Sequence, residues 1–127
     1  MTVIVEGCEL SKKDAAAILN THEVKLDAAV LLKQAIRAGG KVVKLGTIKT
    51  ASGVRAVVRD KGKSEVELEC TVGPNGQAVD IQISIEHGVR KLNTNSTTSL
   101  GGIGYLGVLD DSKKDVAELV FIRITKP

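Results

Sequence analysis

The chain has 127 residues, of which 43% are hydrophobic and 26% charged, and its formal net charge at pH 7 is +3. This length suits one domain with a core of its own, so residues 1–127 are interpreted as a single domain. Only 2% of the residues are aromatic, which argues against the stacking platforms that bind sugars and nucleic-acid bases. The small net charge, with no basic run longer than two residues, gives no indication of nucleic-acid binding.

The sequence predicts a cytoplasmic protein without a membrane contact, a metal or a cofactor. The N-terminal residues lack the basic leader and apolar run of a signal peptide. No window approaches the roughly 20 apolar residues of a membrane span. The cysteines, Cys8 and Cys70, have no metal-ligand spacing and form no disulfide framework, although one bridge between them remains open.

The N-terminal part of the chain predicts a short strand followed by a helix. Residues 2–6 form the strand, which is expected to end at Gly7 and to leave Cys8 in a turn. Ser11 has the side chain of a helix N-cap and predicts a helix over residues 12–19.

A second, more strongly amphipathic helix is predicted to begin after Asp27 and to end at Gly39-Gly40. Its apolar residues recur on one helical face: Ala28, Leu31, Leu32, Ala35 and Ile36. We expect this face to lie on the apolar side of the central strands. Residues 41–50 are predicted to be extended, with a bend or bulge at Gly46.

Residues 53–86 predict a three-stranded antiparallel meander, because apolar and polar residues alternate along its strands. Asn75-Gly76 predicts a two-residue hairpin turn between the second and third strands. That turn sets every inward residue opposite another inward residue, in the pairs Val72–Val79, Cys70–Ile81, Leu68–Ile83 and Val66–Ile85.

The first hairpin of the meander follows from the same argument. Apolar residues meet if Val58 lies opposite Val66, which leaves a loop over residues 61–63. The register then predicts two charge pairs across the strands, Arg59–Glu65 and Arg55–Glu69.

The C-terminal third of the chain carries weaker patterns. Residues 92–99 are polar and predict a loop or a frayed edge, the most mobile region of the molecule. Residues 101–107 are glycine-rich and predict a loop or a softened strand. Residues 116–125 have apolar side chains on both faces, which predicts a last strand in the interior of a sheet.

These elements together predict an α+β fold with two layers. Two N-terminal helices pack on one face of a mostly antiparallel sheet of five to seven strands, with the meander over residues 53–86 at its centre.

The end of the meander carries the residues that are best suited to contact a ligand. His87, Arg90 and Lys91 supply a titratable ring and two cations, beside the amides of Asn93 and Asn95. This set could bind phosphate or act in phosphodiester cleavage, with His87 as the acid or base, yet no second acid/base is evident. A solvated strand end is the plainer interpretation.

Two further patterns are weaker. Gly102 and Gly104 begin a GxGxxG match, but no parallel βαβ unit surrounds it. The alternative is an anion pocket formed by backbone amides. The carboxylates on the outer face of the meander do not converge as a cation site would require, and they suit a basic partner surface better.

The sequence therefore predicts a non-enzymatic binding or interaction protein that self-associates and recognises a protein partner or a small anionic ligand. Its binding residues would be His87, Arg90, Lys91, Asn93, Asn95, Gly102 and Gly104. One alternative is a small phosphate-directed enzyme, similar to a nuclease or phosphodiesterase, that uses His87 with Arg90 and Lys91. The other is a nucleic-acid-binding module.

Overall fold

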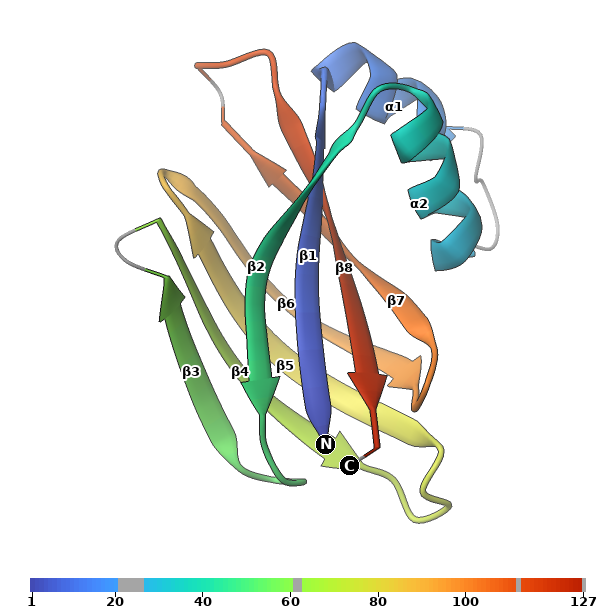
Figure 1. The fold of residues 1–127 in the computed structure, drawn as a ribbon, viewed down its shortest axis with the longest axis vertical. Helices are drawn as coiled ribbons and strands as arrows, with labels where there is room; N and C mark the ends of the chain where they lie inside the picture. Colours follow the sequence, from blue (N-terminus) through green and yellow to red (C-terminus); the bar gives the residue numbers. More distant parts are fainter. Residues whose placement is uncertain (21–26, 61–62, 112, 127) are drawn as a thin grey trace.

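The computed structural model describes residues 1–20, 27–60, 63–111 and 113–126. The described residues form two helices and eight strands (Figure 1). In chain order these are β1 (Thr2–Leu10), α1 (Lys12–Asn20), α2 (Ala28–Arg37), β2 (Lys41–Lys49), β3 (Arg55–Asp60), β4 (Ser64–Val72), β5 (Ala78–His87), β6 (Arg90–Ser99), β7 (Ile103–Asp110) and β8 (Ala117–Thr125).

The strands form two antiparallel four-stranded sheets, in the orders β2-β1-β8-β7 and β3-β4-β5-β6. The predicted α+β class with antiparallel pairing is confirmed, but the single sheet of five to seven strands and the two-layer arrangement are wrong, because the helices and the two sheets form three layers. The first sheet joins the two ends of the chain, since β1 pairs with β8 along its whole length. Local sequence patterns do not show such distant pairing.

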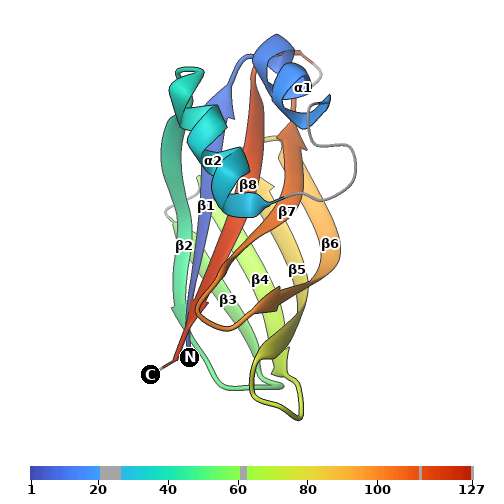
Figure 2. The ribbon, with the colours of Figure 1, turned by 90° about the vertical axis from the view of Figure 1, so that its right-hand side faces the viewer.

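The two sheets face each other and enclose the main core, to which Val5, Leu68 and Ile122 contribute. The helices cover the opposite face of β2-β1-β8-β7, where Leu31 and Phe121 belong to a second core (Figures 1 and 2). The expectation that α2 lies on the meander is therefore wrong, because the other sheet already covers the meander's inward face.

The meander has the predicted register. Val72 pairs with Val79 and Cys70 with Ile81, and Val58 pairs with Val66. The turn differs from the prediction, because the amide of Gly76 donates to the carbonyl of Gly73 at 3.0 Å, which makes Pro74 and Asn75 the central turn residues. The predicted loop over residues 61–63 falls largely outside the described residues.

Strand β1 continues through Gly7, so the predictions that Gly7 ends the strand and that Cys8 lies in a turn are wrong. A Cβ atom on Gly7 would lie 2.3 Å from Oε2 of Glu118, so glycine serves here for close packing. Cys8 is fully buried in the helix-side core and Cys70 in the inter-sheet core, and both are free thiols.

The polar stretch over residues 92–99 belongs to β6, which pairs with β5 from Arg90 to Ser99, so the loop interpretation is wrong. The inward side of β6 lies against β7, where glycines allow a close approach. A Cβ atom on Gly104 would lie 2.9 Å from Thr98, and one on Gly107 would lie 3.2 Å from Leu92. The glycine-rich segment is thus a strand from Ile103 onward.

The other predicted helices and strands are confirmed to within two residues of their expected bounds, although Ile36 of the predicted apolar face of α2 is 48% exposed. The amides of Ala29 and Val30 donate to the Asp27 side chain at the start of α2, and β8 lies inside its sheet between β1 and β7. A bulge in the β1–β2 pairing lies beside Gly46. Among the described residues, neither helix has the length and apolar character needed to cross a membrane.

Candidate functional site

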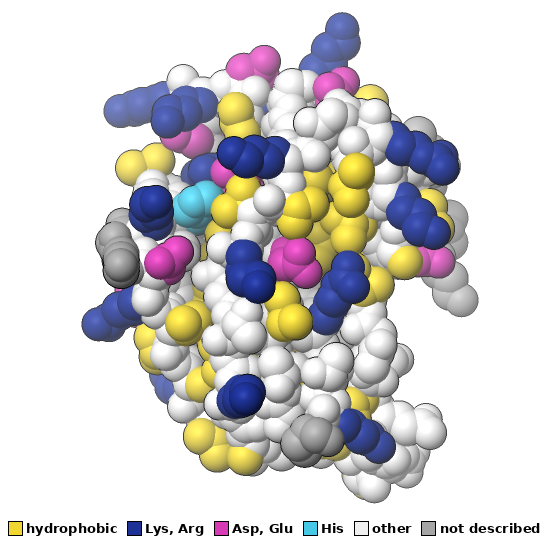
Figure 3. Space-filling model, viewed as in Figure 1, with side chains coloured by type: hydrophobic (Ala, Val, Ile, Leu, Met, Phe, Trp, Pro, Cys, Tyr) yellow, Lys and Arg dark blue, Asp and Glu magenta, His cyan; other side chains and the backbone are white. Residues whose placement is uncertain are grey.

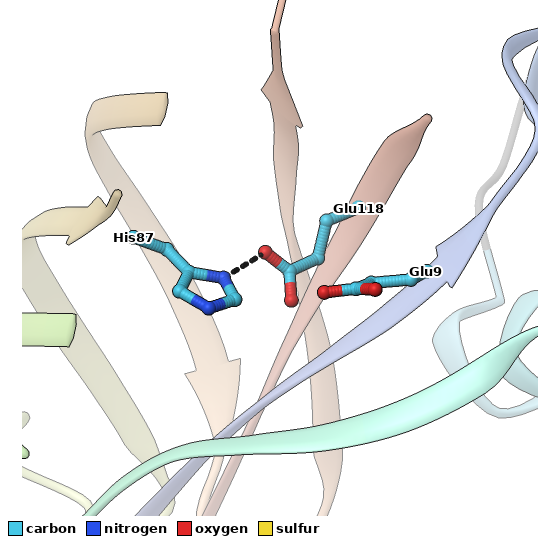
Figure 4. Close-up of side chains that lie close together, drawn as sticks. All are labelled: Glu9, His87 and Glu118. Atoms are coloured by element: carbon cyan, nitrogen blue, oxygen red, sulfur yellow. Dashed lines mark hydrogen bonds and ion pairs between the residues drawn. The ribbon is translucent and has the colours of Figure 1, made fainter. Parts of the chain in front are cut away.

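Four charged or titratable side chains meet between the two sheets at one end of the sandwich. Glu9 in β1 and Glu118 in β8 come from one sheet, and His87 and Arg90 come from the β5–β6 hairpin of the other. We call these four residues the inter-sheet cluster. Figure 4 shows the Glu9 and Glu118 carboxylates lying close together, with the His87 ring facing Glu118. Figure 3 shows histidine, basic and acidic side chains gathered at this edge of the molecule.

Glu118 is the centre of the cluster and is fully buried. Its Oε1 lies 2.8 Å from Nδ1 of His87, and because an ionised carboxylate only accepts hydrogen bonds, Nδ1 donates. Arg90 Nη1 lies 3.6 Å from the same Oε1, and Arg90 Nη2 lies 3.5 Å from Oε1 of Glu9. The cluster therefore connects the two sheets through one short hydrogen bond and two longer ion pairs.

Strand alternation explains why Glu118 points inward. It lies on the same face of β8 as Val120, Ile122 and Ile124, all of which belong to the inter-sheet core. Gly7 in the neighbouring strand leaves the space that the Glu118 side chain fills.

A tight turn brings the two cluster residues of the second sheet together. His87 pairs directly with Arg90 across a turn formed by Gly88 and Val89, so both side chains lie on one face. Gly88 has a φ of 66°, a conformation that glycine adopts without steric cost.

The inter-sheet cluster contains two adjacent carboxylates and buried polar atoms that lack hydrogen bonds. Glu9 and Glu118 are directly opposed across β1 and β8, and like charges in that arrangement destabilise a sheet. Among the described residues, Glu118 Oε2 and Arg90 Nη1 are buried without a hydrogen-bond partner. The pKa of the nearby Cys8 thiol is raised, chiefly by burial and further by the charges of Glu118 and Glu9.

The arrangement favours binding a cation over binding an anion. The ligand atoms of Glu9, His87 and Glu118 lie within 4.8 Å of one another. An incoming phosphate would approach two carboxylates, and the guanidinium of Arg90 is already engaged with both of them.

The structure places the predicted binding residues in three separate regions. His87 and Arg90 belong to the inter-sheet cluster. Lys91 points to the opposite side of the sheet, where its Nζ lies 3.7 Å from Oε1 of Glu86. The predicted trio of His87, Arg90 and Lys91 therefore does not converge.

Asn93 and Asn95 lie on the outer face of β3-β4-β5-β6. Asn93 accepts a hydrogen bond from Ser84. Both line a hollow of about 570 Å³, together with Arg55, Glu67, Gln82 and Ser84. This hollow is open and polar, and it lies on the other side of the sheet from His87.

Gly102 and Gly104 lie at the junction of β6 and β7, in a third region. They line a smaller hollow of about 380 Å³ with Ser96, Thr98 and Tyr105. Its lining includes Ala28, the first residue of α2, whose N-terminal amides are already bonded to Asp27.

Sequence reasoning missed Glu9 and Glu118. The available signal was the position of Glu118, a carboxylate at an inward position of a strand whose other inward residues are Val120, Ile122 and Ile124. A charged residue in such a place is rarely buried without a partner.

Comparison with known proteins adds no identification: no protein-family model, no curated protein and no solved structure matches the chain.

Proposed function

We propose that this chain is a non-enzymatic binding protein that recognises a basic protein partner through the outer face of β3-β4-β5-β6. The observation that carries this proposal is the polar hollow of about 570 Å³ on that face. Its lining supplies both hydrogen-bond donors and acceptors from side chains on neighbouring strands.

The side chains of the outer face stand in rows across the four strands. One row contains Arg55, Glu69, Gln82 and Asn95, and the next contains Val57, Glu67, Ser84 and Asn93. Such rows present amide and carboxylate groups at the regular spacing of a sheet, which suits contact with the polar surface of another protein.

The charges of this face favour a basic partner. Arg59 pairs with Glu65 at 3.1 Å as predicted, whereas Arg55 pairs with Glu67 at 3.0 Å and not with Glu69, the predicted partner that lies opposite it. Lys91 pairs with Glu86. Glu69 and Asp80 also lie on this face, which leaves an excess of carboxylates. Complementary charge on a partner would favour encounter and correct orientation.

The enzymatic alternative has less support. His87 donates to a buried carboxylate, Arg90 is paired with two carboxylates, and Lys91 lies on the other face. A phosphate-directed mechanism needs these cations to converge on one substrate. The nucleic-acid alternative is also disfavoured, because the polar outer face carries more carboxylates than cations.

Self-association has limited support from the strand edges. The edge strands β2 and β3 carry Lys41, Lys44 and Lys49, and Arg55 and Arg59, respectively. Charged side chains on an edge strand oppose pairing with a second copy. Sizing chromatography across a range of concentrations would detect a dimer if one forms.

The proposal is tested by site-specific photocrosslinking from position 82, at the centre of the outer face, followed by mass spectrometry. We expect crosslinks to a partner whose contact surface is basic. The double variant Glu69→Lys/Asp80→Lys should weaken this binding at least tenfold, whereas Lys33→Glu on the distant helix α2 should not. Equal binding by all variants, or crosslinks only to acidic surfaces, would refute the proposal.

A further inference from the structure

We propose that Glu9, His87 and Glu118 bind one divalent transition-metal ion of the Zn²⁺ class, which joins the two sheets at this end of the sandwich. The ligands come from β1, β8 and the end of β5, so a bound ion would connect the first sheet to the second. This inference concerns the interior of the sandwich and is independent of the binding role of the outer face.

The spacing of the three ligand atoms is close to that of a metal site. The three residues offer ligand atoms within 4.8 Å of one another. In a tetrahedral site, ligand atoms that lie about 2.0–2.2 Å from Zn²⁺ lie about 3.4 Å from one another. Glu9 and His87 are only partly buried, so rotation of their side chains toward the fixed Glu118 carboxylate would bring the ligand atoms to this spacing.

One oxygen of the Glu118 carboxylate needs a partner. Its side chain is fully buried, and Oε2 lacks a hydrogen-bond partner among the described residues. A buried carboxylate oxygen without a partner is costly. This oxygen lies on the Glu9 side of the carboxylate in Figure 4, and coordination to a cation would satisfy it.

The charge of the inter-sheet cluster also favours a cation. The directly opposed carboxylates of Glu9 and Glu118 carry two negative charges, and Arg90 supplies one positive charge at distances of 3.5 and 3.6 Å. Among Glu9, Glu118 and Arg90, one negative charge remains uncompensated. A divalent cation would compensate it, and the guanidinium would then compete with the ion for the same carboxylates.

The ligand types select the class of metal. Imidazole nitrogen with carboxylate oxygens suits Zn²⁺ and similar ions, whereas Mg²⁺ and Ca²⁺ prefer oxygen ligands alone. Three protein ligands leave a fourth position of a tetrahedral site for water.

The experiment is a titration of the wild-type protein with ZnCl₂, monitored by NMR of the histidine ring signals. The chain has two histidines, and His22 lies outside the described residues and serves as an internal reference. We expect the ring signals of His87 to shift and saturate at one equivalent, while MgCl₂ has no effect. Unchanged His87 signals, or shifts confined to His22, would overturn the proposal.

Matched variants of β1 give a second readout by calorimetry. Glu9→Gln should weaken Zn²⁺ binding at least tenfold. Glu6→Gln should not, because Glu6 lies on the opposite face of β1 and pairs with Arg123 at 3.6 Å. Their side chains are similarly exposed, at 29% and 25%. Equal loss in both variants, or no loss in either, would contradict the site.

Arg90→Gln tests the competition between guanidinium and metal. Removing this positive charge should tighten Zn²⁺ binding at least tenfold, because Arg90 faces both carboxylate ligands. Unchanged or weaker binding in a folded variant would contradict the proposed position of the ion. Circular dichroism establishes that each variant is folded.

Discussion

The molecule contains two groups of ion-paired side chains whose surroundings differ. On the outer face of β3-β4-β5-β6, Arg59 pairs with Glu65 at 3.1 Å, and their side chains are 73% and 37% exposed. In the inter-sheet cluster, His87 lies 2.8 Å from Glu118, and these side chains are 18% and 0% exposed. The residue types and distances are similar, but water reaches only the first pair freely.

This difference determines what each group contributes. Exposed ion pairs are screened by water and contribute about 0.2–1 kcal/mol to stability. A buried pair adds little net stability when it forms, but loss of one partner leaves an unpaired buried charge and costs about 3–5 kcal/mol. Residues of the outer face can therefore be replaced at little cost in stability, whereas residues of the inter-sheet cluster cannot.

The largest effect is expected from Glu118→Ala. This change removes the acceptor of His87 and one of the two carboxylates that pair with Arg90, and it should lower the free energy of unfolding by about 3–5 kcal/mol. Urea denaturation provides the measurement. Glu86→Ala is the control, because Glu86 is exposed and, among the residues that the structure describes, pairs only with Lys91 on the outer face. If both variants lose the same amount, burial does not distinguish the two groups.

The pH dependence of stability tests the effect of burial on a second kind of titratable group, the inward-facing Cys70 thiol. Burial raises the pKa of the Cys70 thiol from 9.0 to about 11. The unfolded thiol ionises first, so the stability it contributes is complete below pH 9 and is lost as pH rises to about 11.

This pKa difference corresponds to about 3 kcal/mol for a fully buried thiol. Urea denaturation at several pH values should show that Cys70→Ala loses less stability than the wild type between pH 9 and 11. Tyr105→Phe separates the two groups, because burial raises the pKa of Tyr105 from 10.0 to about 12, so its contribution is lost only above pH 10 and the variant should match the wild type between pH 9 and 10. An identical pH dependence in the wild type and Cys70→Ala would contradict this account.

Gly7→Ala should have an intermediate effect. The added Cβ would lie 2.3 Å from Glu118 Oε2, and the buried side chain has little room to move. We expect a loss of about 1–3 kcal/mol, typical of overpacking in a core. Thermal denaturation would measure it. In a Glu118→Ala background the same change should cost much less, and equal costs in both backgrounds would exclude Glu118 as the cause.

The smallest effect is expected from Glu65→Gln on the outer face. The exposed partner Arg59 remains solvated after the change, so the loss should lie below about 1 kcal/mol. Urea denaturation at low and high salt would measure it, and the difference from wild type should shrink as salt increases. A loss comparable to that of Glu118→Ala would contradict the comparison.

The sequence predicted those features that depend on neighbouring residues. The meander register followed because the alternation of Val66, Leu68 and Cys70 had to match that of Ile81 and Ile83, and both are local patterns. The start of α2 at Asp27 also follows from local capping chemistry. The Gly73–Gly76 turn was placed correctly, although its central residues were not.

The second sheet and the inter-sheet cluster could not be predicted in the same way. Glu9 and Glu118 become neighbours only because the two ends of the chain pair as β1 and β8. The role of Gly7 depends on the Glu118 side chain that lies over it. Of the cluster, the sequence indicated His87 and Arg90, but the carboxylates that determine their chemistry are distant in the chain.

The most direct test of the account is a double-mutant cycle on His87 and Glu118, with a parallel cycle on Arg59 and Glu65. Both cycles use alanine substitutions and the free energy of unfolding in urea. We predict a coupling energy of at least about 1.5 kcal/mol for the buried pair and below about 0.5 kcal/mol for the exposed pair. Equal coupling energies in the two cycles would contradict the claim that burial gives the cluster its structural role.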